Sequence, residues 1–184
     1  MAHAEQREFF TAMKTKFPTS FSYRWVLEVG SLNINGTVRD FFTNCEYTGV
    51  DVGPGPGVDV VAHGETLDYS DRIFDVVVSA ECFEHNPEWL ATFLNMCRMS
   101  NNLVLFTCAT TGRAEHGTRR TDTGSSPLTA GWDYYRNLTA QDFEDAVDMG
   151  ALFDDYEFSV NDTSHDLYFW GTVKEHDATI EARA

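Results

Sequence analysis

Hydrophobic positions along the chain fall into short, strand-like runs and longer segments with helical spacing. Near the N-terminus, Phe9, Phe10 and Met13 recur at helical spacing, which predicts an amphipathic helix over residues 4–14, within the N-terminal helical segment 1–20. Five short apolar runs follow, each with the length and composition of a buried strand. These runs cover residues 25–30, 47–52, 58–61, 74–79 and 103–108.

Two of the segments between these runs carry helix signals. A helix is expected to begin at about Gly36, before the second strand. Asn86 precedes a proline and an acid, an order typical of a helix N-cap and first turn. The helix behind Asn86 is expected to bury one apolar face. That face comprises Leu90, Phe93, Leu94 and Cys97.

The last third of the chain predicts one more helix and two more strands. Thr139 and Asp142 have capping-box spacing, and Gly150 is expected to end the helix that they begin. Alternating residues at 156–160 and an aromatic-rich run at 167–173 predict two strands close in sequence, which favours an antiparallel pair. The complete pattern predicts an α/β fold, with a Rossmann-like, seven-stranded, mostly parallel sheet and helices on both faces.

Composition limits the kinds of protein that this chain can be. Its 184 residues fit a single domain over 1–184, and 42% of them are hydrophobic, as in a folded globular protein. The formal charge of −16 argues against a surface built for nucleic acid or for anionic membranes. No apolar run is long enough to span a membrane, and the N-terminus does not resemble a signal peptide. We therefore expect a cytoplasmic protein whose oligomeric state the sequence leaves open.

The cysteines and histidines show no metal-binding spacing. None of the four cysteines forms a CxxC pair, and four are too few to make a disulfide framework in a chain of this length. We expect reduced, mostly buried thiols at Cys45, Cys82, Cys97 and Cys108. No zinc spacing and no EF-hand loop is visible, so no metal site is expected.

Ligands of open parallel sheets bind beyond the carboxyl ends of the strands, so the residues that follow each strand are the candidates. The turn after the first strand contains Gly30 and Gly36 but not the three glycines of a dinucleotide fingerprint, which weighs against NAD and FAD. Gly30 fits a close ligand approach and a plain tight turn equally well. Asp51 ends the second strand, where a carboxylate can accept both hydroxyls of a ribose, and we favour this role over that of a turn carboxylate.

Three stretches together carry a resemblance to a known family. They are residues 25–31 (WVLEVGS), 47–51 (YTGVD) and 74–85 (FDVVVSAECFEH). Their order and spacing resemble the class I S-adenosylmethionine-dependent methyltransferases, in particular a small methyltransferase-domain group whose fourth strand ends in a Ser-x-Glu…Glu-His stretch. The similarity extends over residues 20–173.

The resemblance implies S-adenosyl-L-methionine as the cofactor and assigns a role to each matching position. Asp51 would hold the ribose and Val52 would lie against the adenine. His63 and Gly64 fall where the family reads the adenine edge. The remaining positions would border the methionine and sulfonium part of the cofactor. These are Glu28, Gly30, Ser31, Ser79, Ala80 and Glu81.

The chain departs from the family pattern at two positions. Leu32 replaces the second glycine of the first turn, although Gly36 lies a little later in the same turn. His63 replaces the usual adenine-reading acid, so the adenine contact would come from its imidazole, from a backbone carbonyl or from Glu65. Both departures concern the exact contacts to the cofactor rather than its class.

A long polar stretch at 109–134 has no periodicity and is expected to be a substrate loop. It contains His116, the catalytic candidate as general base, which fits a solvated loop histidine as well. His85 is the second candidate for the base, with a structural role beside the helix cap as its alternative. Glu81 could face the sulfonium or be a satisfied carboxylate at the strand end.

Three arginines in this stretch stand out in so acidic a chain. Arg113, Arg119 and Arg120 could bind an anionic substrate, or they could pair with the protein's own acids. Trp132 and the tyrosines beside it could cover the substrate or pack on the sheet.

These patterns predict methyl transfer from S-adenosylmethionine to a small, anionic acceptor, such as a metabolite or a sugar or lipid headgroup, with oxygen preferred as the acceptor atom. Two alternatives stay open: a non-catalytic protein that binds the cofactor, and an enzyme on the same fold that cleaves the cofactor in another way. A dinucleotide-dependent reductase is disfavoured by the missing glycines.

Overall fold

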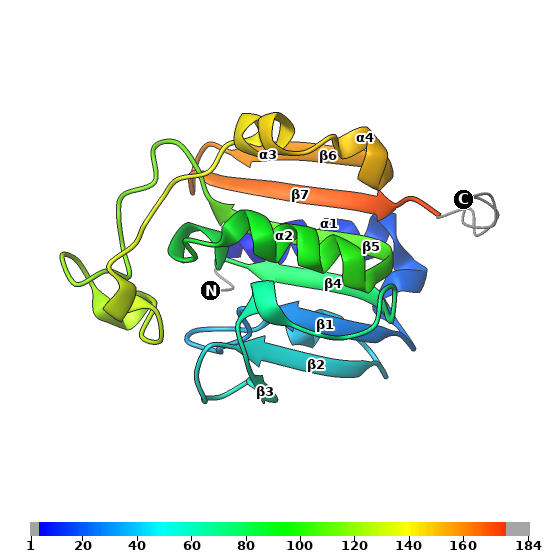
Figure 1. The fold of residues 1–184 in the computed structure, drawn as a ribbon, viewed down its shortest axis with the longest axis horizontal. Helices are drawn as coiled ribbons and strands as arrows, with labels where there is room; N and C mark the ends of the chain where they lie inside the picture. Colours follow the sequence, from blue (N-terminus) through cyan, green and yellow to red (C-terminus); the bar gives the residue numbers. More distant parts are fainter. Residues whose placement is uncertain (1–3, 176–184) are drawn as a thin grey trace, which may run out of the picture.

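A seven-stranded sheet forms the centre of the molecule. The computed structural model describes residues 4–175, and its strands lie in the order β3-β2-β1-β4-β5-β7-β6 (Figure 1). Their bounds are β1 Trp25–Val29, β2 Glu46–Asp51, β3 Val60–Val61, β4 Phe74–Ala80, β5 Ser100–Ala109, β6 Phe153–Asn161 and β7 Asp166–Val173. All seven expected strands are therefore present, although β3 is shorter than expected and β5 is longer.

Strand direction follows the length of the connections. The first five strands all run parallel to one another in the sheet. Each of the first four is connected to the next strand along the chain by a crossover segment. β7 runs antiparallel to both β5 and β6, and only residues 162–165 connect β6 to β7. The expected antiparallel pair at the C-terminal edge is thus confirmed.

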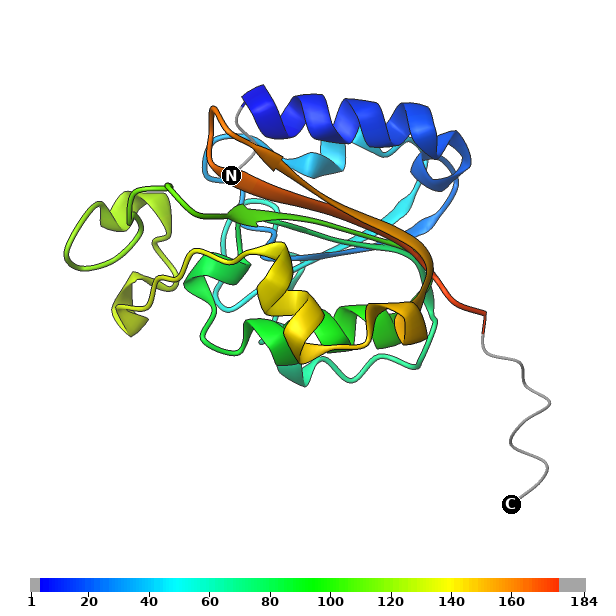
Figure 2. The same cartoon turned by 90° about the horizontal axis from the view of Figure 1, so that it is seen from above.

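Helices cover both faces of the sheet, as Figure 2 shows. α1 (Ala4–Lys16) lies on one face, where Phe10 packs with Val26, Val76 and Leu105. On the other face lie α2 (Trp89–Met99), α3 (Ala140–Ala146) and α4 (Met149–Leu152). An aromatic cluster fills the core beneath them. It includes Phe83, Phe93, Phe106, Phe143 and Phe169.

Two expected helices differ from the prediction. The segment after Gly36 forms only a short 3-10 turn at Val38–Phe41, with Thr37 accepting a hydrogen bond from the Arg39 backbone N–H. The capping box at Thr139 and Asp142 is present as expected, but α3 ends at Ala146. The backbone then becomes extended, and Asp148 caps the separate turn α4. Gly150 lies inside α4 and does not end the helix, so that part of the prediction is wrong.

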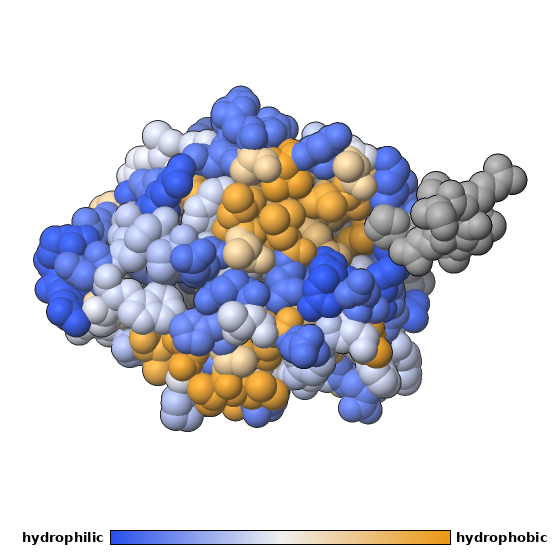
Figure 3. Space-filling view, in the orientation of Figure 1, coloured by the Kyte–Doolittle hydropathy of each residue, from blue (hydrophilic) through white to orange (hydrophobic). Residues whose placement is uncertain are grey.

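The buried face of α2 also differs in one position. Phe93 and Cys97 are buried as expected, but Leu94 is 41% exposed, because the buried stripe runs through Trp89 and Met96 instead. Hydrophobic side chains gather on this side of the molecule, over α2 and the C-terminal helices (Figure 3). Asn86 accepts a hydrogen bond from the Glu88 backbone N–H and so shapes the turn that leads into α2.

Among the described residues, no helix is long and apolar enough to cross a membrane. All four cysteines carry free thiols, and two of them, Cys97 and Cys108, are buried.

Candidate functional site

The strand order places a crevice beyond the carboxyl end of β1. The chain passes from β1 to β2 on one side and later returns to β4 on the other, which is the switch point where open α/β sheets bind ligands. Two adjoining cavities lie there, a larger one of about 580 Å³ and a smaller one of about 360 Å³, both measured with their open mouths. Gly30, Asp51, Cys82 and Thr129 line both cavities.

The Asp51 carboxylate lies at the boundary between the two cavities and is held by the backbone. One of its oxygens accepts a hydrogen bond from the Leu32 N–H at 3.0 Å, and the other accepts one from the Val52 N–H at 2.8 Å. Partial burial raises the pKa of Asp51 above its ordinary value, and these two hydrogen bonds oppose that rise. Since a carboxylate has four acceptor sites, Asp51 keeps capacity for a ligand.

Gly30 allows the backbone to turn sharply beside Asp51. Its φ is +82°, and a Cβ atom at this position would lie 2.6 Å from the Cβ of Cys82. Both the backbone conformation and the close approach of Cys82 therefore require glycine. Gly30 and Cys82 pack against each other here, and both line the two cavities.

The smaller cavity has one wall from the sheet and one from the long loop. Val52, Gly64 and Glu65 line it from the sheet side, and Trp132 lines it from the loop. The His63 ring stacks on Trp132, with 5.7 Å between ring centroids and 20° between planes, and its Nδ1 lies 3.2 Å from a Glu65 oxygen. Trp132, expected to cover a substrate or to pack on the sheet, thus lies against His63.

Four of the expected cofactor residues line neither cavity: one is His63, which stacks on Trp132, and the other three are buried. Ser79 is buried and donates to the Val29 carbonyl at 2.8 Å. Ser31 is also buried, in the turn that follows β1. Glu28 accepts a hydrogen bond from the Tyr47 hydroxyl at 2.8 Å, and burial raises the pKa of Glu28 to about 7. The three buried residues lie beneath the crevice, and the role of all four toward a cofactor stays a prediction.

The larger cavity is lined by polar side chains from β4 and from the long loop. β4 ends at Ala80, and Glu81 comes directly after it. His85 lies further along, in the 3-10 turn Phe83–His85. His116 and Arg113 reach the cavity from the loop. Glu81 has a φ of +53°, and both of its carboxylate oxygens are buried without a hydrogen-bond partner. Buried carboxylate oxygens are costly to leave unpaired, so this wall is suited to a polar ligand.

Burial favours the neutral form of both histidines of this wall. Their rings are 4.9 Å apart and nearly perpendicular, and Tyr135 packs 5.0 Å from His116. Burial lowers the pKa of His85 to about 3, with a smaller contribution from His116. Burial also lowers the pKa of His116. The Nδ1 atom of His116 lies 3.1 Å from the Ala114 carbonyl oxygen, which can only accept, so the proton is on Nδ1 and the lone pair on Nε2.

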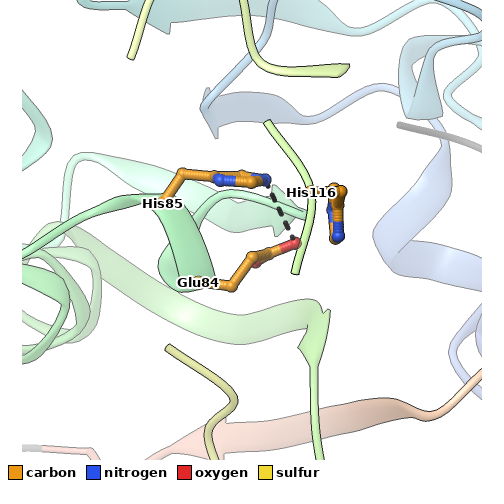
Figure 4. A group of neighbouring side chains, drawn as sticks. All are labelled: Glu84, His85 and His116. Atoms are coloured by element: carbon orange, nitrogen blue, oxygen red, sulfur yellow. Dashed lines mark ion pairs between the residues drawn. The ribbon is translucent and has the colours of Figure 1, made fainter. Parts of the chain in front are cut away.

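Glu84 was missed as a site residue, although it lies in the stretch that carries the resemblance. Its side chain is fully buried, and neither of its oxygens has a hydrogen-bond partner. The Nε2 atom of His85 lies 3.9 Å from one of these oxygens, and Figure 4 shows Glu84, His85 and His116 turned toward one another. Burial, followed by the nearby Glu81, raises the pKa of Glu84 well above its ordinary value. Burial therefore drives both Glu84 and His85 toward their neutral forms, so this contact is not a strong ion pair.

Only one of the three expected substrate arginines lines a cavity. Arg113 does so while donating to Asp166 and to the Ser164 carbonyl. Arg119 donates to the Gly131 carbonyl at 2.8 Å. Arg120 pairs with Glu115 and Asp133.

The loop over residues 109–134 closes on both cavities. A Cβ atom at Gly53 would lie 2.8 Å from a Leu128 methyl carbon, so the loop contacts the turn after β2. At Gly117, φ is +67° and a Cβ atom would lie 2.7 Å from the His85 ring. Glycine at 117 therefore lets the loop pass directly over His85 and places His116 beside it.

Known structures share this fold, although their sequences are distant. The chain is similar to 1,6-didemethyltoxoflavin-N1-methyltransferase from Burkholderia thailandensis, solved with bound 1,6-didemethyltoxoflavin and S-adenosylhomocysteine, with a TM-score of 0.58 and 13% identity over 95% of this chain and 93% of that one. It is also similar to phosphoethanolamine N-methyltransferase 2 from Haemonchus contortus, solved with S-adenosyl-L-methionine, with a TM-score of 0.60 and 14% identity over 92% of this chain and 53% of that one.

A third similar structure is that of a protein named for a different reaction. The cyclase SpnF matches with a TM-score of 0.56 and 14% identity, over 86% of this chain and 62% of that one. No protein-family model matches the sequence, and no curated protein matches it. The chain thus has the fold of the class I S-adenosylmethionine-dependent methyltransferases, as its sequence stretches predicted, and the reaction must be argued from the site.

Proposed function

We propose that this protein transfers a methyl group from S-adenosylmethionine to a small acceptor. The observation that carries the proposal is the Asp51 carboxylate, held by two backbone N–H groups at the boundary of two cavities and beside the glycine turn at Gly30. A nucleoside ligand needs an acceptor pair for its ribose and a flat site for its base. Asp51 would supply the first, and the smaller cavity beside Trp132 would supply the second.

The two cavities would divide the cofactor between them. Asp51 would accept the ribose hydroxyls, and Val52, Gly64 and Trp132 would enclose the adenine in the smaller cavity. His63 would support the adenine side through its stack on Trp132. The larger cavity would take the methionine part and the acceptor, along a wall that ends in Ala80 and Glu81.

The cofactor supplies a methyl group that is already activated on a sulfonium, so the chain's own work is to bind, orient and exclude water. The loop at 109–134 serves this purpose because it covers both cavities. His116 is the proposed general base: its Nε2 carries a lone pair, and its lowered pKa keeps it neutral near pH 7.

The acceptor is proposed to be a small molecule or a headgroup that fits beneath the loop. The sequence favoured an anionic acceptor that three arginines would recognise. Since Arg119 and Arg120 are engaged with the protein's own groups, such recognition would rest on Arg113 alone. Oxygen remains the proposed acceptor atom, because a neutral imidazole can remove its proton.

Calorimetric titration tests the cofactor assignment. We expect S-adenosylmethionine and S-adenosylhomocysteine to bind and NADH not to bind. Asp51→Ala should weaken both sulfur ligands about 100-fold, which is about 2.7 kcal/mol, because two charge-assisted hydrogen bonds are lost. Asp154→Ala, which removes an exposed carboxylate on β6, is the matched control. Tight NADH binding, or equal affinity in Asp51→Ala, would contradict the proposal.

A methyl-release assay against acidic metabolites and sugars tests the reaction. We expect turnover of at least one acceptor class, and loss of turnover with donor affinity retained in His116→Ala. Retained turnover in that variant would remove His116 from the mechanism. Donor binding without turnover on any acceptor would instead favour a non-catalytic protein that binds the cofactor.

A further inference from the structure

Glu84, His85 and His116 form a compact group at the inner wall of the larger cavity. Each offers one ligand atom, and these atoms lie within 4.8 Å of one another (Figure 4). We propose that the three side chains bind one divalent transition-metal ion of the zinc type. His85 and His116 line the same larger cavity as Asp51, but the existence of the metal site does not depend on the proposed methyl transfer.

The first argument is the environment of Glu84. Its carboxylate is fully buried and lacks any hydrogen-bond partner, although most buried polar side chains in folded proteins have one. The turn that carries it is rigid, because the neighbouring Phe83 is fully buried among the core aromatics. The carboxylate therefore cannot turn out to water, and a bound cation would satisfy both of its oxygens.

The second argument is the orientation of the two imidazoles. His116 directs its Nδ1–H to the Ala114 carbonyl, which leaves Nε2 as the free donor atom. A backbone carbonyl on the remote ring nitrogen is the usual support of a metal-binding histidine. His85 directs Nε2 toward Glu84, and its Nδ1 is buried without a partner. Both rings thus have a nitrogen available for a ligand.

The donor set determines the kind of metal. Two imidazole nitrogens and one carboxylate oxygen match catalytic zinc sites and the related sites of non-haem iron, which keep an open position for water or substrate. Magnesium and calcium prefer oxygen ligands alone, so they should bind poorly. Metal–ligand bonds are about 2.0–2.2 Å, so the three atoms must draw together around the ion. The loop that carries His116 can supply this movement without disturbing the sheet.

Metal binding would change the role of His116. In a metal-bound form, His116 would hold the ion through Nε2, and the bound ion would supply Lewis-acid activation of an acceptor. In the metal-free form the same atom remains available as the general base. The sequence gives no spacing signal for this site, because two ligands are adjacent residues and the third is on a separate loop.

The test is metal binding by the full chain after treatment with a chelator and in the absence of any methyl donor. Zn²⁺ is titrated by calorimetry, and Co²⁺ is followed by its visible absorption bands, which report the coordination geometry. We expect one ion per chain, and at least 100-fold weaker binding in Glu84→Gln and in His116→Ala. His165→Asn removes an imidazole outside the group, keeps a residue that tolerates the φ of +55°, and should bind as the parent does.

Several results would overturn the inference. They are binding of neither ion, unchanged affinity in both variants, or a preference for Mg²⁺ over Zn²⁺. His116 lies on a loop and is not fully buried, so we expect His116→Ala to fold. This variant then tests the metal site even if Glu84→Gln does not fold. Because no donor is present, a negative result here leaves the calorimetric test with S-adenosylmethionine unaffected, and the two proposals fail independently.

Discussion

The carboxylates on the two sides of the crevice differ in how they are hydrogen-bonded. On the β1–β2 side, Asp51 receives two backbone hydrogen bonds and Glu28 receives one from Tyr47. On the β4–β5 side, Glu81 and Glu84 have buried oxygens without partners. Both sides belong to one sheet, and they meet where β1 pairs with β4.

This difference indicates which side is complete without a ligand. Backbone donors at the strand ends fix Asp51 before any ligand arrives, so that side is preorganised. The β4–β5 side leaves polar groups unsatisfied, and these stabilise the protein only when a ligand or ion joins them. Four substitutions test this difference between the two sides.

The largest effect is expected from Gly30→Ala. A Cβ atom there would clash with Cys82 and force a non-glycine residue to a φ of +82°. We expect a loss of about 3–4 kcal/mol in the free energy of unfolding, measured by urea titration, together with loss of donor binding. Gly131→Ala, at a loop glycine where a Cβ atom has space, is the control. Equal stability of the two variants would contradict the rigid corner.

The next effect concerns the dependence of stability on pH. The pKa of Glu28 is raised from 4.5 to about 7 in the folded protein, so the native state holds this proton more tightly than the unfolded chain does. The stabilisation that protonated Glu28 provides is fully present below pH 4.5 and is lost as the pH rises through 7. The lost contribution is on the order of 3 kcal/mol.

Glu28→Gln should therefore be more stable than the parent at pH 8 and about equal at pH 4.5, because the amide keeps the hydrogen bond from Tyr47 without a buried charge. Urea titrations at both values measure the difference. Parallel curves for parent and variant between pH 4.5 and 8 would show that Glu28 does not titrate in this window.

A smaller effect is expected from Gly117→Ala. The added methyl would meet the His85 ring, so the loop must move away and carry His116 with it. We expect turnover to fall about tenfold, which is about 1.4 kcal/mol, while S-adenosylmethionine affinity changes little. A parallel loss of donor affinity would mean that the loop acts on both sides of the crevice as one unit.

The smallest effect is expected from Arg120→Ala. The Arg120 side chain is 53% exposed and pairs with Glu115 and Asp133, and exposed pairs of this kind contribute about 0–1 kcal/mol. The KM of an acceptor should change less than twofold, whereas Arg113→Ala should raise it clearly if the acceptor is anionic. A large rise in KM for Arg120→Ala would show that Arg120 contributes to acceptor binding after all.

The sequence predicted the sheet well because strands depend on local hydrophobic runs. The runs around Val26, Val50, Val77 and Leu105 are confirmed as β1, β2, β4 and β5. The C-terminal helix was less predictable, because Val147 leaves the helix for an extended conformation that tertiary packing stabilises. Leu94 was expected on the buried face of α2, but Met96, two residues later and on the opposite side of the helix, is buried in the core instead.

The site was predictable where the strands position it and not where the loop does. Gly30 comes directly after β1, whereas Asp51 and Ala80 are the last residues of β2 and β4. The strand order brings all three to one crevice. Glu84 could not be identified, since a buried acid without a partner is visible only in three dimensions. The arginines were equally ambiguous, because pairing with Asp133 depends on how the loop folds back.

The loop at 109–134 has one further consequence for the order of events. Its Leu128 contacts the turn after β2, its Trp132 stacks on His63, and its His116 lies against His85, so a single segment forms the outer wall of both cavities. Under the proposed function, the spent donor and the modified product would both leave from beneath this segment. Its opening would then set an upper limit on the turnover rate.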